Sequence, residues 1–377
     1  MATISNTPRP GYVWDSADNV WYPIGVGAHQ HTNAADTPAV MPYSTYAAAG
    51  KNKLINSDFV INQYGFTTGS NGTAYVADRW KYSASTTGTA SRETFTPGTA
   101  PVSGYEGKNY LRMVTSGQSG AGAIAAFTTR VEDVRTFAGQ TTTLSFWARA
   151  ASGTPFVAVD WLQLFGTGGS SPVVGTGQKQ AITTSWARYS FTINIDSVAG
   201  KTISTSNDSS VQIEIWTSAG TDYNTRAASM GIQSNTIDIW GVQWEAGSTV
   251  TAFQTATGNP ASELAACQRY YYRQTTTTNF GNLHGVGVEV ATTSGWFNHF
   301  PPTTMRTKPS SVDYSGLKVS NASTSFAITA LSLNANNADG SFFMTDWTSA
   351  SGGTANRPCI IQANNNSAAY IGFSAEL

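Results

Sequence analysis

The chain has 377 residues, a length typical of two or three domains rather than one. Only 11% of the residues are charged and the formal net charge is −1, so charge gives no reason to expect a nucleic acid or an acidic membrane as partner. Aromatic residues make up 12%, which favours a folded protein over a disordered one. The sequence lacks an apolar run near the roughly 20 residues of a membrane helix and an apolar signal-peptide core, so we expect synthesis in a cytoplasm without membrane insertion.

Residues 1–52 differ from the rest of the chain. Tyr12, Trp14, Trp21 and Tyr22 lie there among Pro, Gly and Asp residues. So short a fragment cannot bury these aromatic side chains by itself, and we predict that it anchors the chain on another protein. An arm packed on the chain's own domain is the alternative.

His29 and His31 lie in the linker that ends this segment. In an extended chain, residues two apart point to the same side. One such pair offers two imidazoles, too few for a closed transition-metal site, whereas three copies around a threefold axis would offer six. A metal site at these residues therefore requires a trimer; the alternative is two solvent-exposed histidines.

Residues 53–258 are predicted to form an antiparallel jelly-roll β-sandwich. The first clear strand is AYVADRWKYS (Ala74–Ser83), and WARYSFTINI (Trp186–Ile195) shows the cleanest alternation of apolar and polar residues. Gly241 interrupts the alternation of the last strand, as a β-bulge would. Strands of this length between Gly/Ser/Thr loops indicate two packed antiparallel sheets.

Residues 259–274 are predicted to form a single connecting helix. Asn259 is a good N-cap, Pro260 suits the first helical position, and Arg269 and Arg273 complement the dipole at the end. Residues 275–377 are predicted to form a smaller C-terminal β-sandwich domain, in an all-β chain. So small a core gains stability by self-association, and we predict a trimer. The two cysteines, Cys267 and Cys359, are expected to be buried thiols.

The sequence offers no convincing catalytic site. No nucleophile elbow, P-loop or dinucleotide fingerprint is present. A glycosidase needs two carboxylates on facing positions, and solvent-facing strand carboxylates are the alternative we favour. The candidates on predicted strands are Asp78, Asp160, Glu214, Asp238 and Glu245. We predict that the chain is not an enzyme and has no cofactor, apart from the metal considered above.

Four tryptophans are candidates for sugar stacking: Trp147, Trp161, Trp216 and Trp296. A flat aromatic ring can pack on the apolar face of a pyranose while polar neighbours bind its hydroxyl groups. The alternative for each is packing between the sheets or at a subunit contact.

Several stretches resemble bacteriophage fibre and tail-appendage proteins. NKLINSDFVINQYG and AYVADRWKY resemble the opening of their jelly-roll unit, which is like a carbohydrate-binding module. LSFWARA, TTSWARYSFTI and IDIWGVQWEAGSTVTAFQ follow in the order expected of that unit. ELAACQRYYYR resembles the helix that ends it, and FPPTTMRTKPS with GFSAEL resembles a small C-terminal domain of trimeric fibres. RPGYVWDSADNVWYPIG is similar to virion-attachment ends of phage minor structural proteins.

The resemblance implies a homotrimeric structural protein of the virion, bound through its N-terminus to other virion proteins of the tail or capsid. It implies iron as the metal that His29 and His31 would hold on the trimer axis. We expect adhesion to host surface polysaccharide. The alternatives are a head fibre or capsid decoration protein without a receptor, and a polysaccharide-degrading, tailspike-like enzyme.

Overall fold

A computed structural model of the chain describes residues 12–15, 20–23, 50–337 and 339–377. Residues 1–46 and 47–377 are separate units. In the first unit, β1 (Tyr12–Asp15) pairs antiparallel with β2 (Val20–Pro23), and Trp14 lies opposite Trp21. The four aromatic residues predicted to anchor the chain therefore share one hairpin, whose role stays a prediction. His29 and His31 lie outside the described residues. Within the described ranges, no helix is long and apolar enough to cross a membrane.

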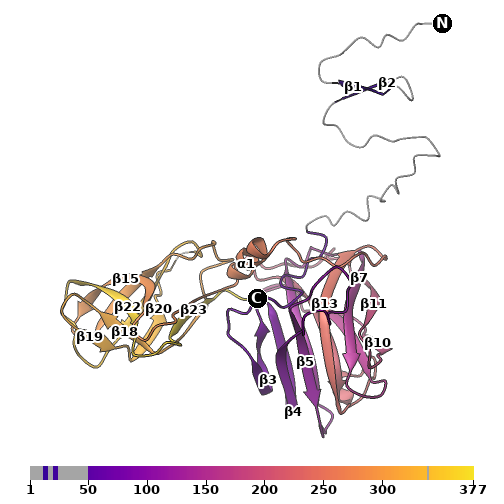
Figure 1. Cartoon of the computed structure of the whole chain (residues 1–377), viewed down its shortest axis with the longest axis horizontal. Coiled ribbons are helices and arrows are strands. Elements are labelled where there is room, and N and C mark those ends of the chain that lie inside the picture. Colours follow the sequence, from indigo (N-terminus) through magenta and orange to yellow (C-terminus); the bar gives the residue numbers. More distant parts are fainter. Residues whose placement is uncertain (1–11, 16–19, 24–49, 338) are drawn as a thin grey trace. The chain divides into compact units, whose positions relative to one another are not determined.

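Residues 50–377 contain two β units. Eleven antiparallel strands between Thr68 and Ala246 form the sheet of the first β unit (Figure 1). They are β3 (Thr68–Ala77), β4 (Trp80–Thr94), β5 (Asn109–Thr115), β6 (Ile124–Glu132), β7 (Thr141–Ala150), β8 (Phe156–Leu164), β9 (Val173–Val174), β10 (Gln178–Ala181), β11 (Ala187–Asn194), β12 (Ser210–Ala219) and β13 (Asn235–Ala246). Their order is β10-β8-β12-β6-β4-β5-β13-β7-β11, with β3 also paired to β4 and β9 to β8.

The sheet curls because β4 belongs to both of its halves. The start of β4 pairs with β6 and its end, from Gly88, pairs with β5. Thr87, between the two parts, has a φ of 66°, a left-handed conformation that turns the strand. The two halves enclose one apolar core, which includes Trp80, Phe127, Phe146, Trp240 and Trp244. This architecture is consistent with a β-sandwich and confirms the all-β prediction; the jelly-roll topology stays a prediction.

Two local features of this sheet can be compared with the sequence analysis. The bulge at Gly241 is confirmed, since the pairing of β13 with β7 shifts register between Trp240 and Gln243 and Gly241 has a φ of 64°. The prediction of one strand over Ala74–Ser83 was wrong. β3 ends at Ala77 and β4 begins at Trp80, because the turn residue Arg79 adopts a φ of 71° and reverses the chain.

The α-helix α1 (Pro260–Gln268) begins as predicted and ends earlier. The Asn259 side chain accepts a hydrogen bond from the Ser262 amide at 2.9 Å. The predicted extension to residue 274 was wrong, because Tyr271–Thr275 form β14, paired with β23 (Tyr370–Ser374). Aromatic residues favour strands, and here the tyrosine run finds a partner strand about a hundred residues away.

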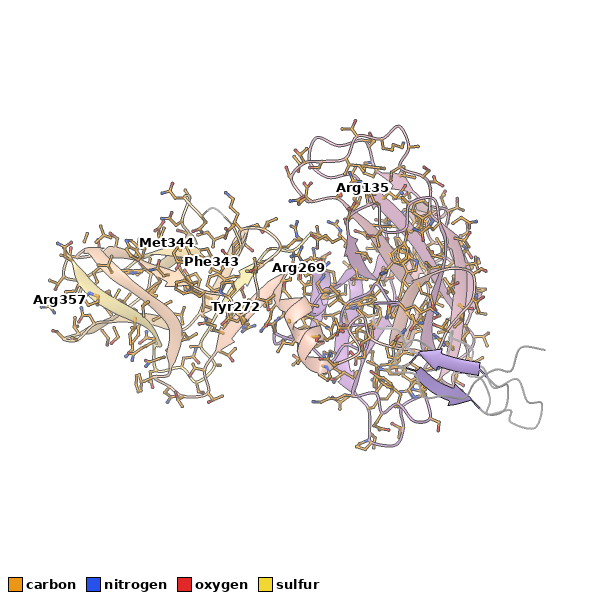
Figure 2. All side chains as sticks on the ribbon, turned by 90° about the horizontal axis from the view of Figure 1, so that it is seen from above. Arg135, Arg269, Tyr272, Phe343, Met344 and Arg357 are labelled. Atoms are coloured by element: carbon orange, nitrogen blue, oxygen red, sulfur yellow. The ribbon has the colours of Figure 1, made fainter. Side chains whose placement is uncertain are left out.

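Two antiparallel sheets make up the second β unit. One has the order β14-β23-β17 and the other β19-β18-β22-β15-β16-β21-β20. The strands are β15 (Asn282–Ala291), β16 (Ser294–His299), β17 (Ser311–Ser315), β18 (Leu317–Ser320), β19 (Ser325–Ala327), β20 (Ala330–Leu333), β21 (Phe343–Thr348), β22 (Arg357–Ala363) and β23 (Tyr370–Ser374). Phe343 and Met344 show the alternation on β21, with Phe343 in the core (Figure 2). Cys267 and Cys359 are free, buried thiols, as predicted.

The two β units meet at a buried joint of charged and aromatic side chains. Arg79 forms an ion pair with Glu376, and its guanidinium lies 3.6 Å from the centroid of the Tyr270 ring. Tyr64 stacks between Tyr75 and Tyr271, with ring centroids 4.6 and 3.7 Å away. This stack fixes the Tyr75 ring, which also lines the site described next.

Candidate functional site

The sheet of the first β unit has an outer face, turned away from the core, on strands β3, β4, β6, β12 and β8. The cross-strand register arranges its side chains in rows that run across the strands. One row is Ser83, Ala126, Trp216, Ala158; the next is Lys81, Thr128, Glu214, Asp160; the third is Arg130, Gln212, Leu162. A row of side chains can contact a ligand only where no other segment of the chain covers it.

The segment 220–234 covers the first row. Ala227 and Met230 pack on Trp216, Ala126 and Ala158 in a small apolar cluster of their own. Trp216 is fully buried, and the Arg226 guanidinium lies 5.3 Å from its ring centroid. This part of the outer face is therefore closed to a ligand.

Arg226 also holds the two carboxylates at the far end of the second row. It donates to Asp160 at 2.8 Å and forms an ion pair with Glu214. Burial and the neighbouring Glu214 raise the pKa of the Asp160 carboxyl, while Arg226 and the Trp216 indole N–H oppose this. Asp160 is 1% exposed. The expectation of solvent-facing strand carboxylates was wrong for all five candidates, because a loop arginine pairs with Asp160 and Glu214 and the other three carboxylates are buried as well.

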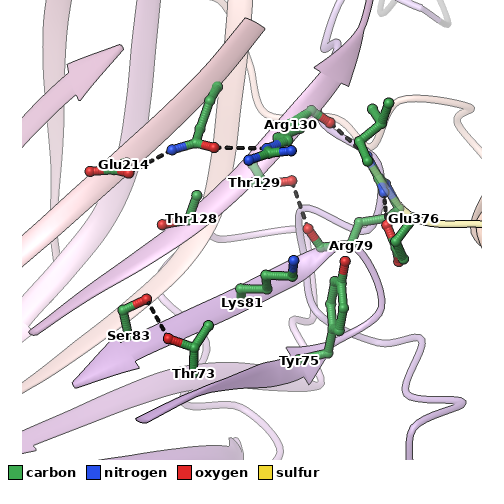
Figure 3. A pocket seen from close by; sticks show the side chains of 12 residues that line it. Thr73, Tyr75, Arg79, Lys81, Ser83, Thr128, Thr129, Arg130, Glu214 and Glu376 are labelled. Atoms are coloured by element: carbon green, nitrogen blue, oxygen red, sulfur yellow. Dashed lines mark hydrogen bonds and ion pairs between the residues drawn. The ribbon is translucent and has the colours of Figure 1, made fainter. Parts of the chain in front are cut away.

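The uncovered part of the outer face is a groove of about 230 Å³ (Figure 3). Its walls come from four neighbouring strands and from the end of the second β unit. The lining residues are Thr73, Tyr75, Arg79, Lys81, Ser83, Thr128, Thr129, Arg130, Gln212, Glu214, Glu376 and Leu377. Nearly all carry a hydroxyl, amide or charged group. We refer to this set as the groove.

A second hollow of about 410 Å³ shares Arg130 and Leu377 with the groove. Leu164, Thr167 and Asp208 are among its other lining residues. Asp208 accepts hydrogen bonds from the Thr167 amide at 2.8 Å and hydroxyl at 2.6 Å. The two hollows are therefore neighbours on the surface, and a ligand longer than one sugar unit could contact residues of both.

Hydrogen bonds hold the polar side chains of the groove in place. Gln212 donates to Glu214 at 2.6 Å and accepts from Arg130 Nε at 2.8 Å. One network of ion pairs and hydrogen bonds therefore connects Arg226, Glu214, Gln212 and Arg130, and it extends from the covered row into the groove. Groups fixed in this way on strands lose little conformational freedom when a ligand binds.

The four predicted tryptophans do not come together. Trp147 is buried beneath Arg188, whose guanidinium lies 4.4 Å from its ring centroid. Trp161 is 6% exposed and has Gly175 against its indole. Trp216 is covered as described, and Trp296 is half-buried on β16 of the second β unit. Three of the four therefore offer no open ring face to a sugar. The expectation that these rings stack on sugars was wrong for them, because the rings are buried in the core or under a loop.

Apart from Glu214, which was one of the candidate carboxylates, the groove residues were not predicted from the sequence. Alternation along WKYSA places Lys81 and Ser83 on the face opposite Trp80 and Tyr82, and this signal was available in the sequence. It does not show that Arg130 and Gln212 lie on the neighbouring strands. Among the residues that the structure describes, no group of three or more His, Cys, Asp or Glu side chains is placed to hold a metal ion.

No protein-family model and no curated protein matches the chain. Solved structures match about half of it. A putative sugar-binding protein from Bacteroides thetaiotaomicron is 14% identical, with a TM-score of 0.31 over 52% of this chain and 100% of that one. The family 11 carbohydrate-binding module of Clostridium thermocellum, in complex with a mixed-linked tetrasaccharide, is 8% identical, with a TM-score of 0.29 over 49% and 100%.

A phage protein is also among the matching structures. The enzymatically active domain of tailspike protein 4 from bacteriophage CBA120 is 14% identical, with a TM-score of 0.29 over 52% of this chain and 22% of that one. At these identities and TM-scores, the likenesses carry no information on what this chain binds.

Proposed function

We propose that the chain is a non-enzymatic structural protein of a bacteriophage virion that binds host surface polysaccharide in the groove. The observation that carries the glycan-binding part is the groove itself, a depression on the outer face of the sheet lined with polar side chains that a hydrogen-bond network holds in place. Sugar hydroxyls are recognised by such fixed donors and acceptors, and the Tyr75 ring supplies an aromatic edge.

The virion part of the proposal is supported by the order of the sequence segments that resemble phage fibre proteins. In this proposal the hairpin of β1 and β2 attaches the chain to other virion proteins, and His29 and His31 hold iron on the axis of a homotrimer. Many copies on one particle would convert weak sugar contacts into useful avidity. Labelling the chain on intact virions tests its location, on the tail or on the head.

An apolar sheet face supports self-association. On β15, Val286 and Val290 are 58% and 56% exposed, and Trp296 on the paired strand β16 lies half-buried beside them. Ile360 of β22 lies opposite Val286 on the other side. An exposed apolar face of this kind is typical of a protein contact, and in this proposal it is covered by the next copy of the chain.

Filling the groove tests the binding site. Thr128→Trp places a large ring on the groove floor and is expected to reduce binding on an array of bacterial surface glycans by about tenfold or more, the equivalent of about 1.4 kcal/mol. Thr192→Trp on the exposed face of β11 is the matched control and should bind as the parent does. Equal binding by both variants would remove the groove from the proposal, and absence of glycan binding by the parent chain would reject the function.

A further inference from the structure

Two cations in the groove have no acidic partner. Lys81 and Arg130 line it, and no ion pair within the described residues involves either one. The Lys81 ammonium lies 4.7 Å from the centroid of the Tyr75 ring. Arg130 uses its Nε on the neutral Gln212 amide. Neither cation therefore has a carboxylate in direct contact, in contrast to the neighbouring arginines, although Glu376 attracts both from a greater distance and Glu214 attracts Arg130.

The other charged groups around the groove are paired with one another. Arg79 is neutralised by Glu376, and Arg226 takes up both Glu214 and Asp160. In the adjoining hollow, Asp208 accepts two hydrogen bonds from Thr167 on one of its carboxylate oxygens. Glu214 and Glu376 are thus ion-paired with arginines, and the two side-chain charges of the groove that have no ion pair, Lys81 and Arg130, are both positive.

Lys81 and Arg130 are placed to act on one group. Lys81 of β4 lies directly opposite Thr128 of β6, and Arg130 is two residues further along the same face of β6. Such diagonal neighbours have Cβ atoms roughly 7–8 Å apart, so two long side chains can reach a shared ligand atom. Figure 3 shows the Lys81 and Arg130 side chains on the same side of the sheet, around one hollow.

Burial disfavours the charged form of both cations. Burial lowers the pKa of Lys81, and the nearby Arg130 lowers it further. Burial also lowers the pKa of Arg130. A bound anion would relieve both effects, since an opposite charge within a few ångströms favours the charged form.

We propose that the groove is specific for an acidic saccharide, and that Lys81 and Arg130 bind its anionic substituent together. This inference rests on the proposed function and names the class of glycan. The shared chemistry is an anionic group on a sugar, either the carboxylate of a uronic acid or the phosphate of a phosphodiester-linked polymer. The Arg130 guanidinium suits two parallel hydrogen bonds to such a group, and the Lys81 ammonium acts as a point charge.

The test compares acidic polysaccharides with their neutral counterparts on the full chain. The probes are a panel of uronate-containing bacterial polysaccharides, the same polymers after reduction of their carboxyl groups, and a panel of phosphodiester-linked glycans. Lys81→Gln and Arg130→Gln are each expected to weaken binding of acidic probes by about tenfold, the usual size of a lost charge-assisted hydrogen bond. Arg130→Lys, which keeps the charge but loses the two parallel hydrogen bonds, should bind the acidic probes more tightly than Arg130→Gln and less tightly than the parent.

Lys108→Gln removes one exposed lysine outside the groove and is the matched control. Binding of acidic probes should also fall as salt rises, because exposed charges are screened. One outcome would overturn this inference and leave the proposed function intact. In that outcome, the carboxyl-reduced or other neutral glycans bind as strongly as the acidic probes, and Lys81→Gln and Arg130→Gln do not change the binding. If no probe of either kind binds, both fail. Binding to the uronate panel would identify the anionic group as a carboxylate, and binding to the phosphodiester panel would identify it as a phosphate.

Discussion

The two β units of residues 50–377 each leave one sheet face turned away from their cores, and the two faces differ in chemistry. The face on β4, β6 and β12 carries polar side chains held by a hydrogen-bond network. The face on β15 and β16 carries Val286, Val290 and Trp296. In both β units, the alternation of side chains along the strands gives the sheet a second face, but it does not determine what that face binds. Fixed polar groups suit reversible contact with a hydrated ligand, whereas an apolar face suits a lasting protein contact.

The largest expected effect comes from removing the residue that organises the polar face. Arg226→Ala leaves Asp160 and Glu214 side by side without a cation, and breaking a buried pair in this way costs about 3–5 kcal/mol. Chemical unfolding measures this loss, and Arg226→Lys should lose less. A change below about 1 kcal/mol would contradict the structural role of Arg226.

This variant also has a predictable pH dependence. Burial and Glu214 already raise the pKa of Asp160 in the folded chain above its usual value near 3.8, and loss of Arg226 raises the pKa further. A group with a raised folded pKa contributes stability that is present at low pH and lost as pH rises through that pKa. Arg226→Ala should therefore lose more stability, relative to the parent, at pH 8 than at pH 5.

A change to the apolar face tests the other half of the comparison. Val286→Asp combined with Val290→Asp should weaken self-association by about 3 kcal/mol or more, because burying each valine is worth roughly 1.5–3 kcal/mol. Sedimentation at micromolar concentration measures the oligomeric state. Val174→Asp, at a residue 48% exposed on β9 of the first β unit, is the control. A parent chain that is monomeric at this concentration would remove the trimer from the proposal.

The smallest expected effect concerns Asp208 in the hollow that adjoins the groove. Burial would raise its pKa, but hydrogen bonds from Thr167 and Ser204 outweigh this and hold the pKa at about 2. A lowered folded pKa contributes stability that is present above the unfolded value and lost as pH falls toward the folded one. Asp208→Asn should therefore remove a part of the acid sensitivity between about pH 4 and pH 2. Because the side chain is only partly buried, the difference should stay below about 1 kcal/mol in acid titrations of unfolding.

Local chemistry explains what could be predicted about the fold. The start of α1 follows from the Asn259 cap, and the Gly241 bulge from a break in alternation. The strand Ala187–Asn194 was predicted because its apolar residues recur every second position, and Phe191 and Ile193 are indeed buried. Each of these features depends on residues only a few positions apart.

The site could not be predicted in the same way. The sequence by itself determined an all-β chain with one helix and gave each strand two chemically distinct faces. Only the tertiary structure decided which strands are neighbours, and therefore that Lys81 lies diagonally from Arg130, that Arg226 covers Asp160 and Glu214, and that the tyrosines after α1 pair with β23. The physical reason is that pairing between distant strands and burial under a loop are set by long-range packing, and no local pattern encodes either one.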